Sequence, residues 1–194
     1  MKLKDSQTYK NLARAFAGEC QARTRYEFIE YGAREQGYKA LADIIDKIAY
    51  QEFTHSRMMY SFIQTAGDGT IDNIEVCTGY PFRQKWDLAD NLKFAAEDEG
   101  IEAEQLYPEF AKVAKEEGFN DIAAFFNNLI KIEASHKAEF FRLYKQFKEG
   151  KLYKSEVPVV WKCPDCGYES TSKQAFEICP VCQAKQGVVL IKEA

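Results

Sequence analysis

The sequence predicts a mainly α protein: a four-helix bundle with one long crossover, followed by a small β-rich metal domain. Three observations predict it. Four long segments of helical periodicity fill the first 150 residues, and a glycine-containing connection over residues 67–86 divides them into two pairs. Four of the six cysteines then stand in two C-x-x-C pairs near the end of the chain.

Composition limits the class of protein. The chain has 194 residues, of which 46% are hydrophobic and 29% charged, so it can bury a core and is not a disordered chain. No apolar run is long enough to span a bilayer, and Met1–Ser6 lack the apolar region of a signal peptide. The net charge is −4 without a basic segment, which argues against nucleic-acid binding. We therefore expect a soluble, cytoplasmic protein with neither nucleic-acid nor membrane partners.

Each helical segment has a start and a stop signal. The four expected segments run from an Asp5/Ser6 cap to about Gln36, from Tyr38 to Ala66, from Asp87 to before Gly118, and from an Asn120 or Asp121 cap to Gly150. Pro108 falls inside the third segment, where it should kink the helix or remove part of its hydrogen bonding.

The connections decide how the helices are arranged. Very short links join the first segment to the second and the third to the fourth, so each pair should be an antiparallel hairpin. The connection between the pairs contains Gly67, Gly69, Gly79 and Pro81. One long crossover in a four-helix bundle is the ferritin-like arrangement.

Each segment carries a glutamate in the middle of its apolar stripe. At 100° per residue, Glu19, Glu52, Glu99 and Glu133 share faces with leucine, isoleucine, alanine and aromatic residues. His55 and His136 follow two of these glutamates at i+3, and Glu102 follows Glu99 in the same way. By contrast, Glu97 and Glu104 point away from that stripe and should be solvated.

Buried charges need compensation, and the stripes supply too few cations to pair with these carboxylates; Arg23 is the nearest candidate. A single Glu-x-x-His motif is common by chance, and a lone buried glutamate is more often a hydrogen-bonded core residue. Two such motifs together with single glutamates on the other two helices are the di-metal constellation of ferritin-like carboxylate proteins. Carboxylates with imidazoles suit iron or manganese, and zinc is harder to exclude.

Several residues near the stripes keep two interpretations. Glu102 is surplus to six ligands. Tyr26 and Tyr107 could hydrogen-bond the ligating carboxylates or simply pack as core aromatics. Cys20 points about 100° away from Glu19, which favours packing over ligation. Cys77 has no identifiable partner in the sequence.

The last part of the chain differs in composition. Residues 151–194 have a net charge of +1, against −5 for residues 1–150, so we divide the chain into domains 1–150 and 151–194, with Pro158 marking an extended start. Cys163, Cys166, Cys179 and Cys182 offer four thiolates to one tetrahedral metal, which stabilises a segment too short for its own core. The ligand set alone does not distinguish iron from zinc.

These motifs resemble those of the rubrerythrin family along nearly the whole chain. The resemblance rests on Ala-Gly18-Glu19, both Glu-x-x-His motifs, Glu99-x-x-Glu102 before Leu106-Tyr107-Pro108, and Trp161-Lys162-Cys163-Pro164-Asp165-Cys166-Gly167-Tyr168. It implies a non-haem di-iron site in the bundle and an Fe(Cys)₄ centre in a rubredoxin-like domain that feeds it electrons. It also implies that Glu102 and His55 exchange as ligands to one iron between oxidation states.

The activity implied by the resemblance is two-electron reduction of hydrogen peroxide to water, a protection against oxidative stress. We accordingly assign Glu102, His55, Tyr26 and Tyr107 as catalytic residues. The implied partners are hydrogen peroxide, an external donor such as a rubredoxin or an NAD(P)H-dependent reductase, and further copies of the chain in a homodimer or larger assembly. The alternative is a ferroxidase or iron-storage protein with a structural zinc ribbon. The chain departs from the family pattern at Gln183, where a glycine usually follows the second C-x-x-C pair, and at Cys20, where many relatives carry a small hydroxyl residue.

Overall fold

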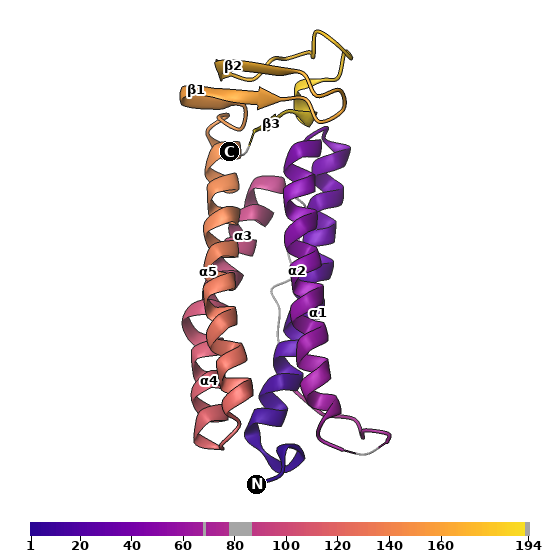
Figure 1. Cartoon of the computed structure of the whole chain (residues 1–194), viewed down its shortest axis with the longest axis vertical. Helices are drawn as coiled ribbons and strands as arrows, with labels where there is room; N and C mark the ends of the chain where they lie inside the picture. Colours follow the sequence, from indigo (N-terminus) through magenta and orange to yellow (C-terminus); the bar gives the residue numbers. More distant parts are fainter. Residues whose placement is uncertain (68, 78–86, 193–194) are drawn as a thin grey trace.

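The computed structural model describes residues 1–67, 69–77 and 87–192, and it stacks a small β domain on one end of a helical bundle (Figure 1). The fold class predicted from the sequence is confirmed: a four-helix ferritin-like bundle precedes a three-stranded antiparallel sheet. Gly79 and Pro81 of the predicted crossover lie outside the described residues. Within the described part of the chain, no helix is both long and apolar enough to cross a membrane.

The first hairpin consists of α1 (Gln7–Glu35) and α2 (Lys39–Gln64), preceded by the short 3₁₀ helix η1 (Leu3–Asp5). Of the two predicted cap residues, Ser6 acts as the cap: its side chain accepts a hydrogen bond from the backbone N–H of Tyr9. The turn between the helices uses Gly37 at φ +85°, a conformation that glycine adopts without a steric penalty.

The third predicted segment is a helix with a wide turn in it. It comprises α3 (Leu88–Ile101), the π-helical turn η2 (Glu102–Leu106) and α4 (Tyr107–Glu116). The Asp87 side chain caps its start by accepting the N–H of Asp90. Pro108 has no N–H to donate to the preceding turn, and the predicted disturbance of hydrogen bonding takes the form of this π turn directly before it.

The fourth helix, α5 (Asn120–Lys148), begins at Asn120, a residue that was expected to be its cap. The prediction of a cap at Asn120 or Asp121 is wrong, because Phe119 is the N-cap residue and has no capping side chain. Phe119 packs against the core after a turn at Gly118, which brings the backbone into the helix early. The Asp121 carboxylate instead accepts the N–H of Ile122 inside the first turn.

The C-terminal part contains β1 (Lys154–Lys162), β2 (Glu169–Gln174), the 3₁₀ helix η3 (Gln186–Val188) and β3 (Leu190–Ile191), with the strand order β2-β1-β3. Pro158 was predicted to begin the extended segment, and this prediction is wrong: the strand β1 begins at Lys154, and Pro158 lies inside it. There the register with β2 shifts between Lys154 and Val159, which suits a residue that cannot donate to the ladder. The predicted domain division after Gly150 stays a prediction; it falls in the link between α5 and β1.

Two hydrophobic clusters fill the bundle, and a polar layer lies between them. One cluster contains Tyr26, Leu41, Leu92 and Phe140, and the other contains Leu12, Met59, Phe110 and Phe126. Along every helix, the residues of the two clusters are separated by one of the buried glutamates predicted as ligands, Glu19, Glu52, Glu99 and Glu133. Apolar packing above and below therefore holds the polar layer in place.

Candidate metal centre

The four helical segments bring six predicted ligands into one buried cluster. Two groups of donors form: Glu19, Glu52, His55 and Glu133 in one, and Glu52, Glu99, Glu133 and His136 in the other. In each group the ligand atoms lie within 4.8 Å of one another. Glu52 and Glu133 belong to both groups, so these two carboxylates can bridge a pair of metal ions. The sequence predicted the six residues but not which of them are shared.

The cluster is short of hydrogen bonds. Seven buried side-chain N or O atoms have no hydrogen-bond partner among the described residues, and all but one, the Tyr153 hydroxyl, belong to this cluster. The six are Glu19 Oε2, Glu52 Oε1, Glu99 Oε2, both carboxylate oxygens of Glu133, and His136 Nδ1. Orphaned buried acceptors cost free energy, and acceptors aimed at a common point are what metal cations satisfy. The donor set therefore fits two metal ions.

Both imidazoles present Nδ1 to the carboxylates within ion-pair distance, and at His136 Nδ1 these contacts lack the angles of a hydrogen bond. His55 Nδ1 lies 2.8 Å from Glu52 and 3.3 Å from Glu133, and His136 Nδ1 lies 2.9 Å from Glu133 and 3.0 Å from Glu52. On the far side of its ring, His136 Nε2 lies 2.8 Å from Oε1 of Gln51. A proton on Nε2, donated to Gln51, leaves the Nδ1 lone pair free for a metal. Sequence reasoning missed Gln51; its place directly before Glu52 on α2 was the available signal.

Tyr26 and Tyr107 make the hydrogen bonds that one interpretation of the sequence expected. The Tyr26 hydroxyl donates to Glu99 Oε1 at 2.5 Å, and the Tyr107 hydroxyl donates to Glu19 Oε1. Each bond runs from one hairpin to the other. Both rings also pack in the hydrophobic clusters, so the two interpretations hold together.

Burial and mutual repulsion keep protons on the metal-free cluster. Burial, together with repulsion from neighbouring carboxylates, outweighs the contacts with the histidines and raises the pKa of Glu19, Glu99 and Glu133 to about 7. Burial opposes the charged form of both histidines, but contacts with carboxylates outweigh it and raise the pKa of His55 to about 10 and that of His136 to about 12. Metal ions would displace these protons.

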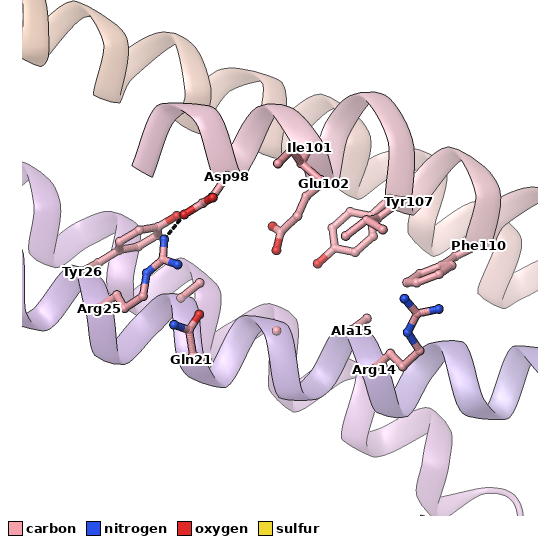
Figure 2. Close-up of a pocket in the computed structure, with 13 residues that line it drawn as sticks. Arg14, Ala15, Gln21, Arg25, Tyr26, Asp98, Ile101, Glu102, Tyr107 and Phe110 are labelled. Atoms are coloured by element: carbon pink, nitrogen blue, oxygen red, sulfur yellow. Dashed lines mark hydrogen bonds and ion pairs between the residues drawn. The ribbon is translucent and has the colours of Figure 1, made fainter. Parts of the chain in front are cut away.

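Glu102 lies beside the cluster, outside both donor groups. It is the first residue of the π turn, and its carboxylate points into a cavity toward α1 (Figure 2). Burial, followed by the charge of Glu19, raises its pKa well above the usual value. The charges of Glu99, Glu133 and Glu52 act in the same direction, so Glu102 lies near carboxylates of both donor groups.

The charged residues and cysteines that the sequence placed outside the ligand set also lie outside it in the structure. Glu97 and Glu104 are exposed, as predicted. Arg23 pairs with Glu27 at 2.9 Å and stacks on Phe53, so it does not neutralise the cluster. Cys20 is half-buried and belongs to neither donor group, and Cys77 is exposed.

The four predicted cysteines form a second candidate metal site in the β domain. The sulfur atoms of Cys163, Cys166, Cys179 and Cys182 lie within 4.8 Å of one another, with Cys163 and Cys179 buried. Backbone N–H groups of Val181 and Cys182 offset burial and lower the pKa of Cys179 to about 7. Four convergent thiols of this kind suit a tetrahedral metal.

The departure at Gln183 leaves the turn intact. Gln183 adopts φ +64°, close to the left-handed conformation of Gly167 at φ +81° in the first turn. Its N–H donates to the Cys179 carbonyl at 3.0 Å, just as the Gly167 N–H donates to the Cys163 carbonyl at 2.9 Å. The two metal-binding turns are therefore alike, although one has a side chain where the other has glycine.

Comparison with known proteins agrees with this geometry. The rubrerythrin family matches residues 10–144, and the rubredoxin-like domain of rubrerythrin matches residues 161–187. A rubrerythrin of Clostridium perfringens is 41% identical over 93% of this chain and 91% of its own length, and one of Porphyromonas gingivalis is 37% identical over 95% and 89%. A solved structure of nigerythrin in a mixed-valence state superimposes with a TM-score of 0.63, at 26% identity, covering 99% of this chain and 94% of the other. With both of its parts matched in the same order, the chain belongs to the rubrerythrin family, which joins a ferritin-like di-iron domain to a C-terminal rubredoxin-like domain.

Proposed function

We propose that this protein is a non-haem di-iron peroxidase that reduces hydrogen peroxide to water with electrons relayed through an Fe(Cys)₄ centre. The observation that carries the proposal is the pair of donor groups that share Glu52 and Glu133 and leave six buried polar atoms unsatisfied. A site of this kind holds two ions next to each other. Iron suits its carboxylate and imidazole donors.

In this proposal Glu19, Glu52, His55, Glu99, Glu133 and His136 hold the iron pair. Bound there, two ferrous ions would supply the two electrons that cleave an O–O bond. The protein supplies a dry site, because five of these six side chains are no more than 4% exposed and His55 is 7% exposed.

Three further side chains act on the substrate side. Glu102 would exchange with His55 as a ligand, a role supported by its carboxylate, which points into the cavity toward α1, close enough to the buried glutamates for their charges to raise its pKa. Tyr26 and Tyr107 hold Glu99 and Glu19 in orientation through their hydroxyl groups. The Glu102 carboxyl, whose pKa burial raises well above its usual value, lines the cavity and would donate a proton toward the departing oxygen.

The electrons come from the cysteine site of a second copy of the chain. Within one chain the β domain packs on the α1–α2 turn, where Gly187 meets Gly37. Glu19 lies 18 residues before Gly37, or about 27 Å along the helix at 1.5 Å per residue. The rate of electron tunnelling falls steeply with distance, so this length favours electron transfer between two copies of the chain in a dimer or larger assembly. An external reductase or rubredoxin then reduces the cysteine site again.

An anaerobic single-turnover experiment tests the proposal. The protein is reduced, mixed with hydrogen peroxide in excess of what the di-iron site alone can reduce, and followed by its ferric-thiolate absorption in the visible. Prompt return of colour with loss of peroxide is expected. Colour that stays bleached while peroxide persists would contradict the peroxidase. Protein that is colourless throughout would indicate zinc in the cysteine site, and faster reaction with oxygen than with peroxide would favour a ferroxidase.

A further inference from the structure

A cavity of about 250 Å³ lies between α1 and the α3–η2–α4 segment (Figure 2). Tyr26, Glu102 and Tyr107 contribute polar atoms to its lining, and both tyrosines hydrogen-bond predicted metal ligands. Along the sides, alanines of α1 leave room opposite η2. Ile101, which is 43% exposed, lies on the outer side.

The cavity is much larger than the substrate proposed above requires. A water molecule occupies about 30 Å³ of liquid volume, so a molecule of two oxygens and two hydrogens needs roughly 60 Å³. A cavity of about 150 Å³ already accommodates benzene. The space beside Glu102 is therefore sufficient for an O–O group that carries an organic substituent of phenyl size.

The side walls suit such a substituent. Ala15, Ala22, Leu106 and Phe110 present apolar surface to the cavity. Charged side chains lie at the two ends of the cavity, and each has a partner within the protein. Arg25 pairs with Asp98, and the Arg14 guanidinium lies 5.4 Å from the centre of the Phe110 ring. A ligand with one apolar end and one polar end therefore matches the cavity better than a small, wholly polar molecule does.

We propose that the cavity binds organic hydroperoxides, with the apolar group against Ala15, Ala22 and Phe110 and the O–O group at Glu102, and that the protein reduces them. The inference rests on the proposed peroxidase function and widens its substrate class. The O–O bond of ROOH breaks, and two protons and two electrons yield the alcohol ROH and water. The electrons derive from an external one-electron donor, a reduced rubredoxin or dithionite, through the metal sites.

Cumene hydroperoxide is the probe. In the anaerobic single-turnover assay, it should restore the ferric-thiolate colour of the reduced, iron-loaded protein and give one equivalent of 2-phenyl-2-propanol. If hydrogen peroxide restores the colour and cumene hydroperoxide does not, the inference is wrong and the proposed function stands. If neither restores the colour, the proposed function itself fails.

Substitution of Ile101 tests whether organic hydroperoxides bind in this cavity. Ile101→Trp should lower the ratio of the cumene hydroperoxide rate to the hydrogen peroxide rate by about tenfold or more, because the larger ring narrows the cavity. Ile132→Trp is the matched control, since Ile132 is similarly exposed at 37% but lies on α5 away from the cavity, and it should keep the wild-type ratio. Ile101→Ala should keep or raise the ratio. A lower ratio in that variant would show that substitution of Ile101 acts by disturbing the π turn, and not by narrowing the cavity.

A binding measurement needs no metal. In the metal-free protein, 2-phenyl-2-propanol should shift the methyl resonances of Ala15 and Ala22, and Ile101→Trp should weaken that binding at least about tenfold. Unshifted alanine methyls at millimolar alcohol would overturn the proposed binding site whatever the rates show.

Discussion

The Tyr26 hydroxyl donates a 2.5 Å hydrogen bond to Glu99 Oε1 and thereby ties α1 to α3 inside the polar layer. The other oxygen of Glu99 has no hydrogen-bond partner among the described residues, so one side of the carboxylate is fixed and the other is open to a metal. Together with the bond from Tyr107 to Glu19, it fixes one carboxylate of each donor group.

Tyr26→Phe should destabilise the metal-free protein by about 1–3 kcal/mol, because the buried Oε1 of Glu99 loses its only hydrogen-bond donor among the described residues while the ring packing is kept. Denaturant unfolding measures the change. Tyr31→Phe on the same helix is the control, since Tyr31 is 64% exposed, and it should unfold like wild type. Equal stability of both variants would mean that the bond contributes nothing to the fold.

Gln51→Leu should weaken metal binding about 10- to 100-fold, the usual effect of removing the partner of a ligating imidazole. The Gln51 side chain is exposed, so the fold should tolerate the change. Competition with a chelator, using Co²⁺ as a spectroscopic probe, gives the affinity, and Gln51→Glu should restore it because a carboxylate also accepts the Nε2 proton. Gln64→Leu, an exposed glutamine of the same helix, should bind metal normally. Unchanged affinity in Gln51→Leu would show that His136 keeps its tautomer without help.

The metal-free protein should lose stability as pH rises from about 5 to 8. Glu19, Glu99 and Glu133 have folded pKa values of about 7, above the ordinary 4.5, so the folded state binds more protons than the unfolded state in this window. The raised pKa of His55, about 10, extends the loss to higher pH. A decrease of about 1 kcal/mol in the free energy of unfolding lowers the melting temperature of a chain of this size by about 2–4 °C.

Melting curves of chelated protein at several pH values measure this trend, with the metal-loaded protein as the control. Bound metal ions replace the protons on these carboxylates, so the melting temperature of the metal-loaded protein should not decrease over this pH range. Glu117 has the opposite sign: Thr8 and the backbone N–H of Gln7 lower its pKa, so its contribution is lost only in acid, below the window used. A chelated protein whose melting temperature rose between pH 5 and 8 would contradict the assignment of buried, protonated carboxylates.

Much of the cluster followed from the sequence because helical periodicity is a local property. A glutamate in an apolar stripe has to face the core wherever the helix packs, so Glu19, Glu52, Glu99 and Glu133 could be placed before their neighbours were known. Which carboxylates are shared depends on how far each helix slides along the others, and that is set by packing of the whole bundle. Gln51 and the Phe119 N-cap of α5 were missed for the same reason: each depends on a contact with a residue distant in sequence.

Gln183→Gly should stabilise the β domain by about 1 kcal/mol, because a glutamine at φ +64° carries a steric penalty that glycine avoids. The denaturant concentration that releases metal from the cysteine site measures the gain. Gly167→Gln in the matching turn should destabilise by a similar amount. A loss of stability in Gln183→Gly would show that the glutamine side chain makes a contact that outweighs its backbone conformation.

Gly187 should be required for packing of the β domain on the bundle. A Cβ atom at this position would lie 1.8 Å from the carbonyl oxygen of Gly37, and both groups belong to backbone that cannot swing aside as a side chain does. Gly187→Ala should therefore displace the domain and expose the link between α5 and β1, while the four cysteines, all outside that contact, keep their metal. Faster proteolysis at residues 149–153, with unchanged visible absorption of the cysteine site, is the expected result. Gly67→Ala is the matched control, since a Cβ there meets nothing within 4 Å. If Gly187→Ala resisted protease as well as Gly67→Ala does, the β domain would not depend on close approach of these two glycines, and the α1–α2 turn would have to be able to move away from it.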